Sequence, residues 1–241
     1  MTTSVVLPTY NERTVIVGVV REILETVADA EVLVVDDDSP DRTWAVVEAA
    51  FAGDGRARAL RRVGRRGLPS ALAEGIAGTR GEAVVWLDAD GSMPAEVIPR
   101  LLAALQAADV AVASRYAPGG RDARDSRLRV GASRAINLLG RVCLGGPVRD
   151  WTSGFVAARR TALERVPLRV HYAYGDYCID FLYRAGRAGL RVVEVPYASL
   201  ERRAGETKTS PHLLRFAALG LRYVGTIVQL RWDTLTRRRA S

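Results

Sequence analysis

The chain has 241 residues, 48% of them hydrophobic, and a formal net charge of +8 at pH 7. This length suits one α/β domain with a full core and leaves little chain for a second domain. Two distant cysteines, Cys143 and Cys178, exclude a disulfide framework and a cysteine-based zinc site. The basic balance fits either phosphate-bearing partners or an arginine-rich surface.

Short apolar runs alternate with helical patterns along the chain. The expected strands, in chain order, are Ser4–Leu7, Glu31–Val35, Ala83–Leu87, Asp109–Ala113 and Arg191–Val195. The expected helices are Thr14–Thr26, Thr43–Phe51, Pro69–Gly78, Pro94–Ala107 and Ala132–Leu144. This alternation predicts an α/β fold with a largely parallel sheet covered on both faces. Two polar segments, Ala117–Arg127 and Arg202–Pro211, are expected to be loops that close over a substrate.

Polar clusters follow the first two strands, where ligands bind in open α/β sheets. The first is Pro8-Thr9-Tyr10-Asn11-Glu12, which by itself also fits a turn that caps a helix. The second, Asp36-Asp37-Asp38-Ser39-Pro40-Asp41, holds four carboxylates within six residues. Helix capping explains one or two of these carboxylates. The others need hydrogen-bond donors or a cation to offset their mutual repulsion.

The third strand is followed by Asp88-Ala89-Asp90. Two carboxylates at this spacing suit a hard cation such as Mg²⁺ or Mn²⁺, with a substrate diphosphate completing the ligand shell. A pair of turn aspartates is the alternative for this motif alone. Its position downstream of the other two clusters favours the metal site.

Taken in order, these three segments resemble family 2 glycosyltransferases of the GT-A fold. The later segments resemble the dolichol-phosphate or polyprenol-phosphate mannose synthase branch of that family. They are Ala113-Ser114-Arg115-Tyr116 with Gly119-Gly120, Asp150-Trp151-Thr152-Ser153-Gly154-Phe155, Glu194-Val195-Pro196, and Arg202 to Lys208. The resemblance implies a Rossmann-like three-layer sandwich around a mostly parallel sheet, with a catalytic domain over residues 1–210.

The resemblance also assigns roles to single residues. On the nucleoside side, it implies that the nucleobase and ribose are held by Pro8, Tyr10 and Glu12, and are also touched by Asp36 and Asp37. It implies metal binding by Asp88 and Asp90, with Asp90 the more direct ligand. The implied cationic residues are Arg115 and Arg129 toward the acceptor and donor phosphates, and Arg202 and Lys208 in a loop over the diphosphate.

The sequence departs from the family after the Asp-Ala-Asp motif. Gly91-Ser92-Met93 stands where Leu-Gln-His is common in the family. The Gln position can contribute to metal coordination, and whether Ser92 takes this role is left open. Lys208 is the only lysine of the chain, which indicates that an ammonium at this position is not freely exchanged for a guanidinium.

The implied reaction is a single in-line displacement with inversion, from a nucleotide-sugar (GDP-mannose first) to a polyprenyl phosphate. A phosphate monoester is mostly ionised at pH 7, so no general base is required. We therefore expect His171 and His212 to be structural or exposed, and Asp150 either to orient the acceptor or to cap a turn.

Other functions stay open at this point. The donor could be UDP-glucose or another hexose nucleotide, and the acceptor a small molecule or a polysaccharide. A nucleotidyltransferase would need a Gly-rich and basic signature near the first strand, and Pro8 to Glu12 lacks it. Nucleic-acid binding has only the net charge in its favour, so we expect no nucleic-acid partner.

Residues 211–241 read as a basic amphipathic helix and tail. Leu213, Phe216, Leu219, Tyr223 and Ile227 fall near one helical stripe, while Arg215, Arg222 and Arg231 exclude a membrane span. With Trp232 and the basic tail 237–239, the helix could lie on an anionic membrane. It could equally pack on the domain or on a second subunit of a homo-oligomer. We expect a cytoplasmic protein, peripheral on the inner face of the cell membrane.

Overall fold

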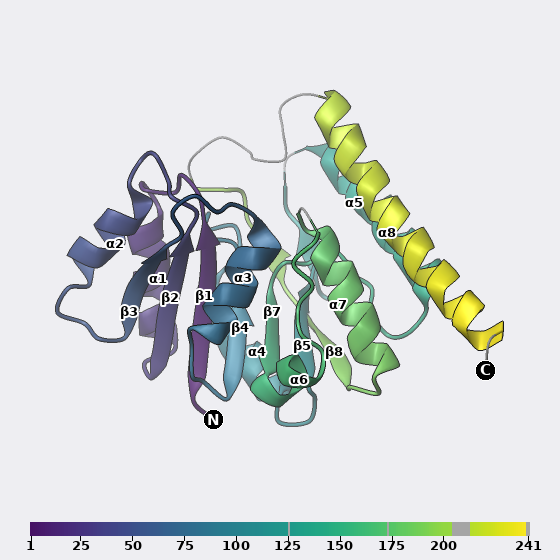
Figure 1. Ribbon diagram of the computed structural model, residues 1–241, viewed down its shortest axis with the longest axis horizontal. Helices are drawn as coiled ribbons and strands as arrows, with labels where there is room; N and C mark the ends of the chain where they lie inside the picture. The colour runs from purple at the N-terminus through teal and green to yellow at the C-terminus, as the bar shows by residue number, and fades with distance from the viewer. Residues whose placement is uncertain (125, 173, 204–212, 240–241) are drawn as a thin grey trace.

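The computed structural model describes residues 1–124, 126–172, 174–203 and 213–239 (Figure 1). Seven strands form one sheet in the order β3-β2-β1-β4-β7-β5-β8. They are β1 (Thr3–Thr9), β2 (Ala30–Asp36), β3 (Ala57–Arg61), β4 (Ala83–Trp86), β5 (Val110–Ser114), β7 (Val156–Arg159) and β8 (Val192–Pro196). All neighbours are parallel except β7, which runs antiparallel to β4 and β5. The predicted α/β fold with a mostly parallel sheet is confirmed.

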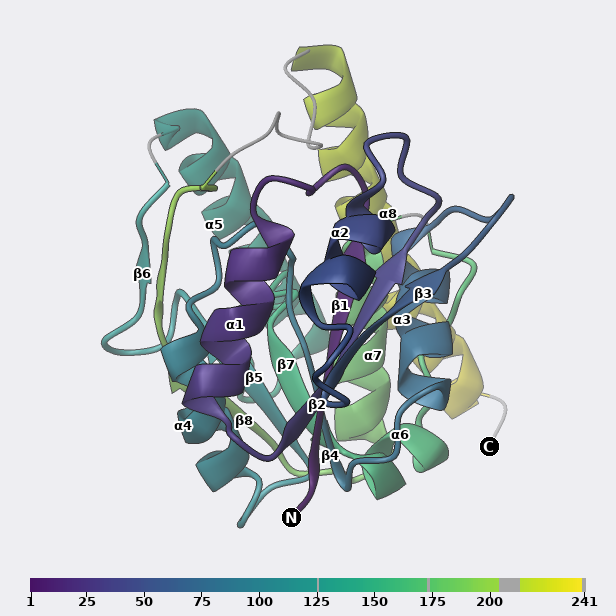
Figure 2. The ribbon, with the colours of Figure 1, turned by 90° about the vertical axis from the view of Figure 1, so that its left-hand side faces the viewer.

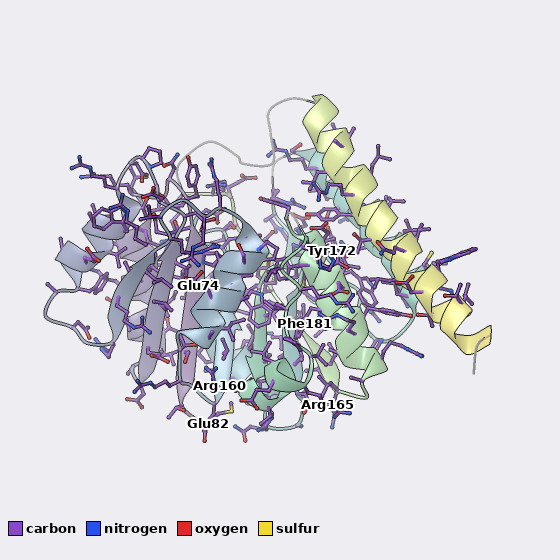
Figure 3. The ribbon with its side chains drawn as sticks, in the orientation of Figure 1. Glu74, Glu82, Arg160, Arg165, Tyr172 and Phe181 are labelled. Atoms are coloured by element: carbon purple, nitrogen blue, oxygen red, sulfur yellow. The ribbon has the colours of Figure 1, made fainter. Side chains whose placement is uncertain are left out.

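Helices cover both faces of this sheet (Figure 2). One core lies under α1 (Ile16–Thr26), α2 (Thr43–Ala50) and α4 (Ile98–Ala104). The other lies under α3 (Leu68–Ala77), α6 (Arg160–Arg165) and α7 (Asp176–Arg187). In this second core, Phe181 of α7 meets Trp86 of β4 edge to face, with ring centroids 5.7 Å apart (Figure 3). The sheet and its two helical layers form the expected three-layer sandwich.

Several boundaries differ from the sequence-based expectation. A 3₁₀ turn, Ala95–Val97, precedes α4, because Pro99 has no N–H to donate and is tolerated only in the first turn of an α-helix. Helix α5 (Arg127–Leu144) begins five residues earlier than expected, where the Ser126 side chain accepts a hydrogen bond from the Arg129 N–H. The segment expected as a loop before it contains β6 (Arg121–Asp122), which pairs with β9 (Ala198–Ser199).

Helix α8 (Leu213–Arg239) lies beside α5 at one end of the molecule and also packs on α7 (Figure 1). Ile227 of the predicted stripe is buried in the second core and Tyr223 packs against it, so packing on the domain accounts for part of the stripe. Of the helices in the described part of the chain, none combines the length and apolar composition needed to cross a membrane. The expected domain boundary at residue 210 lies outside the described residues and stays a prediction.

Candidate active site

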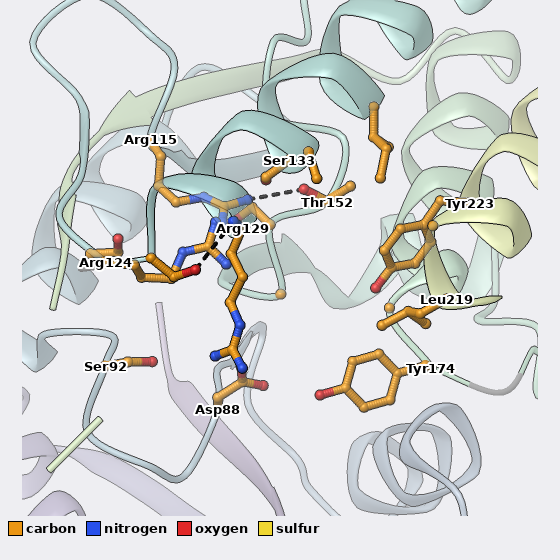
Figure 4. Close-up of a pocket in the computed structure, with 18 of the residues that line it drawn as sticks. Asp88, Ser92, Arg115, Arg124, Arg129, Ser133, Thr152, Tyr174, Leu219 and Tyr223 are labelled. Atoms are coloured by element: carbon orange, nitrogen blue, oxygen red, sulfur yellow. Dashed lines mark hydrogen bonds between the residues drawn. The ribbon is translucent and has the colours of Figure 1, made fainter. Parts of the chain in front are cut away.

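A cavity of about 990 Å³ opens beyond the carboxyl ends of β4 and β5, between the sheet and helices α5, α7 and α8 (Figure 4). One part of its wall is charged and another is apolar. The charged lining residues are Asp88, Asp90, Arg115, Arg124, Arg129, Glu201 and Arg202. Five of the residues implied by the family resemblance therefore meet in one cavity: Asp88, Asp90, Arg115, Arg129 and Arg202.

The two aspartates of Asp88-Ala89-Asp90 follow the buried end of β4. Ala89 between them is packed in the core, so the two acidic side chains are left to line the cavity. Asp90 accepts a hydrogen bond from the Ser92 N–H at 2.9 Å through Oδ1, and its Oδ2 lies 3.4 Å from Arg202. Arg129 extends from α5 toward Asp88 (Figure 4). Ser92 thus supports Asp90 through its backbone.

Arg202 joins the two predicted halves of the site. Its guanidinium forms an ion pair with Glu12 at 2.5 Å in addition to its contact with Asp90. Its Nε is buried and has no hydrogen-bond partner among the described residues. A buried N–H donor without an acceptor is costly, so this atom is suited to an anionic ligand. Glu12 is 3% exposed and its carboxylate is committed to Arg202.

Arg115 is held by a buried carboxylate. Asp150, which is fully buried, accepts hydrogen bonds from Arg115 Nε at 2.8 Å and from its terminal nitrogen at 2.7 Å. Thr152 accepts a further hydrogen bond at 3.0 Å. Burial alone would lower the pKa of Arg115, but Asp150 raises that pKa well above its ordinary value. Asp150 therefore orients Arg115 and does not itself line the cavity.

Arg124 is a cavity residue that the sequence analysis missed. It forms paired hydrogen bonds to Asp122 at 2.8 and 2.6 Å, and Asp122 also accepts a hydrogen bond from the Tyr116 hydroxyl. Burial would raise the pKa of Asp122, but the guanidinium of Arg124 outweighs it and lowers that pKa to about 2. The signal that could have identified Arg124 is its place in the Arg-rich segment after Gly119-Gly120.

The residues expected on the nucleoside side lie at the ends of β1 and β2, outside the lining of this cavity. Asp36 is fully buried and accepts two hydrogen bonds from Ser39. Asp37 accepts from Arg62 at 2.6 Å and from the Gly67 N–H at 2.7 Å. Burial raises the pKa of Asp36, although the hydrogen bonds from Ser39 offset part of the rise.

Tyr10 and Pro8 are half-buried on the same side of the sheet. The Arg66 guanidinium stacks on the Tyr10 ring, 3.7 Å from its centroid. The nucleoside contacts implied for Pro8, Tyr10, Glu12, Asp36 and Asp37 stay predictions.

Lys208 and His212 lie outside the described residues. His171 is exposed, and its ring contacts Tyr172 with centroids 4.3 Å apart, away from the cavity lining. Two tyrosines that the sequence analysis did not assign to the site turn their hydroxyls toward the cavity: Tyr174, and Tyr223 of the predicted helical stripe (Figure 4).

The family model described as glycosyl transferase family 2 matches residues 4–166. The chain is 39% identical over 222 residues to the polyprenol monophosphomannose synthase of Mycolicibacterium smegmatis, which covers 89% of this chain and 83% of that protein. It is 34% identical over 237 residues to the undecaprenyl-phosphate mannosyltransferase of Micrococcus luteus, covering 97% of each.

Among solved structures, the chain resembles glucosyl-3-phosphoglycerate synthase from Mycobacterium tuberculosis in complex with Mn²⁺, UDP and glucosyl-3-phosphoglycerate. The TM-score is 0.69 at 25% identity, over 95% of this chain and 79% of that one. Fold, motifs and similarity agree: the chain belongs to glycosyl transferase family 2, is a glycosyltransferase of the GT-A fold, and falls in the branch of the polyprenol-phosphate mannose synthases.

Proposed function

We propose that this enzyme transfers mannose from GDP-mannose to a polyprenyl phosphate, with inversion and with a divalent metal ion. One observation carries the proposal: a single cavity joins a charged end, at Asp88 and Asp90, to an apolar end. The apolar end is lined from α5 and α8 by Ala132, Ala135, Ile136, Leu219 and Val224. A ligand with an anionic head and a hydrocarbon tail matches both ends. The relatives named for polyprenyl-phosphate mannosyl transfer support the same substrates.

The carboxylates of Asp88 and Asp90 fit Mg²⁺ or Mn²⁺, which prefer a few hard oxygen ligands and a substrate diphosphate. In the described part of the chain, no group of three or more His, Cys, Asp or Glu side chains is placed to hold a metal ion. The donor diphosphate would therefore supply the remaining ligands. When bound, the ion neutralises charge on the departing nucleotide. The Mn²⁺ in the structurally similar synthase complex supports this assignment.

Arg202 is the residue of this chain best placed to hold the donor diphosphate. Its buried Nε donor has no partner within the described ranges, and its other nitrogens are held by Glu12 and Asp90. A guanidinium fixed in this way stabilises the charge that develops on the leaving group without reorganising during the reaction.

The acceptor phosphate fits at Arg129, on the α5 side of the cavity. Because the Arg115 guanidinium is already bound by Asp150 and the Arg124 guanidinium by Asp122, we assign both of these arginines to shaping this subsite. The acceptor oxygen is already ionised near pH 7, so these arginines would orient an attacking oxygen that needs no base.

The outer surface of α5 and α8 fits a membrane that carries such an acceptor. Seven large apolar side chains are exposed on these two helices: Leu128, Leu138, Val142, Leu221, Val228, Trp232 and Leu235. Exposed arginines accompany them: Arg127, Arg134, Arg141, Arg222 and Arg231. Asp233 is the one exposed carboxylate among the described residues of these two helices, so the face is mainly basic. An anionic bilayer therefore complements this face better than a second copy of the chain does.

The donor and the acceptor are tested together. Purified enzyme and Mn²⁺ are incubated with a labelled donor, GDP-mannose or UDP-glucose, and with an acceptor, polyprenyl phosphate or phosphoglycerate. We expect label in the lipid phase from GDP-mannose alone. Ile136→Glu is expected to reduce transfer to the lipid, because it places a charge in the apolar end of the cavity. Lipid label from UDP-glucose alone would overturn the donor, and label only in phosphoglycerate would overturn the acceptor.

Membrane contact is tested by co-sedimentation with vesicles made with or without an anionic lipid. We expect the protein to pellet with the anionic vesicles, and the pair Leu221→Glu and Val228→Glu to leave it in the supernatant. Wild-type protein that stays unbound and sediments as a dimer would instead assign this face to a second subunit.

A further inference from the structure

A short segment after β9 crosses the loop that carries the two metal-binding aspartates. We call residues 200–203 the strap. Its backbone is joined to that loop by two hydrogen bonds, from the Leu200 N–H to the Ser92 carbonyl at 2.9 Å and from the Arg203 N–H to the Asp90 carbonyl at 3.1 Å. The strap is thus anchored to the aspartate loop at both of its ends, and Arg202 between them lines the cavity.

The side chain of Arg203 lies across Gly91. Gly91 has a φ of +75°, which favours glycine, and a Cβ built there would lie 2.6 Å from Cδ of Arg203. The backbone conformation therefore favours glycine, and a Cβ at this position would displace the Arg203 side chain. Gly91 is also one of the three residues, Gly91-Ser92-Met93, that differ from the common family pattern.

Beyond Gly91, the Arg203 guanidinium reaches helix α1. It forms a two-pronged ion pair with Glu22, in which one contact measures 2.9 Å and the second joins the other terminal nitrogen to Oε1. Paired guanidinium–carboxylate contacts fix orientation better than single ones. Both side chains are about 40% exposed, so the pair contributes modestly to stability and its main effect is geometric.

Neighbouring residues of the strap thus have separate tasks. Arg202 contacts Glu12 and Asp90 at the cavity, while Arg203 is held by Glu22 on the outer side of the same loop. We propose that Arg203 and Glu22 form a clamp across Gly91 that positions Arg202 over Asp90, so that Arg203 is a positioning residue of the donor-diphosphate site. This inference rests on the proposed function, which assigns the diphosphate to Arg202 and Asp90.

The clamp itself is tested without substrate, by amide hydrogen exchange at Leu200 and Arg203. We expect Glu22→Ala to speed exchange of both amides by about fivefold, the scale of losing a half-exposed ion pair. Glu25→Ala, an exposed carboxylate on the same helix, is the matched control and should exchange like the wild type. Unchanged exchange in Glu22→Ala would overturn the clamp.

Its positioning role is tested with charge-reversal variants, by titration with Mn²⁺ together with GDP or with UDP and by transfer kinetics. We expect Glu22→Arg and Arg203→Glu each to weaken nucleotide binding and raise KM for the donor about fivefold while kcat changes less. The double variant should recover most of both values, which a loss of folding would not produce. Faster exchange with unchanged nucleotide binding, or no recovery in the double variant, would overturn the positioning role. If the wild type binds neither nucleotide, the proposed donor fails, and the exchange rates still decide whether the clamp exists.

Discussion

Two acidic clusters follow β2 and β4, the strands on either side of β1, and their carboxylates have different partners. After β2, the carboxylates of Asp36 and Asp37 accept hydrogen bonds from Ser39, Arg62 and Gly67. After β4, Asp88 and Asp90 line a large cavity together with arginines from three other segments. The clusters look alike as sequence patterns, since both place aspartates directly after an apolar strand.

The difference lies in the partners that the fold supplies. Arg62 is 2% exposed and reaches Asp37, Glu74 and Ser70 from within the β3–α3 loop, so the charge of Asp37 is balanced inside the protein. Arg202, in contrast, contacts both Glu12 and Asp90, and its buried Nε has no partner in the part of the chain that the structure describes. Carboxylates whose hydrogen-bond and ion-pair partners are all supplied by the protein stabilise the fold. Carboxylates in a cavity whose charged groups are only partly paired can bind a ligand. The following predictions test this distinction.

The largest effect is expected at Asp90. Asp90→Ala should lower transfer about a thousandfold, or about 4 kcal/mol, because the metal ion proposed to neutralise the leaving diphosphate would lose a ligand. Single-turnover transfer of labelled sugar measures the loss. Asp38→Ala, which removes an exposed carboxylate paired with Arg61 in the other cluster, is the control and should stay within about twofold of the wild type. Equal losses in both variants would contradict the distinction.

The second-largest effect is expected on the free energy of unfolding. Arg62→Met should lower the free energy of unfolding by about 3 kcal/mol, because the buried carboxylate of Asp37 is left without its cation. Urea denaturation measures this change. Arg65→Met removes an exposed arginine that also pairs with Glu74 and should cost less than about 0.5 kcal/mol. A cost for Arg62→Met as small as that of the control would show that Asp37 does not depend on Arg62.

The third prediction concerns Asp122, whose carboxylate is paired with Arg124 beside the cavity. A pH series tests this pairing. Its pKa is lowered from 3.8 to about 2, so its ionised form stabilises the fold above about pH 4, and this contribution falls as the pH falls toward 2. Asp122→Asn should therefore cost about 1 to 2 kcal/mol at pH 7, and much less near pH 2. Denaturation of both proteins from pH 7 to 2 measures the gap, and a constant gap would contradict the lowered pKa.

The smallest effect is expected at Ser39. Ser39→Ala removes the hydroxyl that donates to Asp36 at 2.6 Å and should cost about 1 kcal/mol of stability. Activity per folded molecule should hold, because Asp36 lies outside the cavity. Thr236→Val, which removes an exposed helix hydroxyl, is the stability control. An activity loss well beyond the loss of folded protein would assign Asp36 to the nucleoside site.

The sequence determined the features that depend on local spacing. The runs around Val5, Val34 and Val85 predicted β1, β2 and β4, because apolar β-branched stretches bounded by polar turns favour buried strands. Asp88 and Asp90 followed from their place after the third run. Strands β3 and β7 escaped prediction, since arginines interrupt the first and alanines, which rarely favour strands, make up half of the second.

Only the tertiary structure decided which charges meet. Glu22 and Arg203 stand 181 positions apart, and Glu12 and Arg202 stand 190 apart, so no local period indicates either pair. The same holds for α8, whose sequence allowed a membrane, a partner or the domain, and whose Ile227 is buried against the core. Side-chain periodicity fixes which face of an element is apolar, but the surface that covers this face depends on how the elements pack in three dimensions.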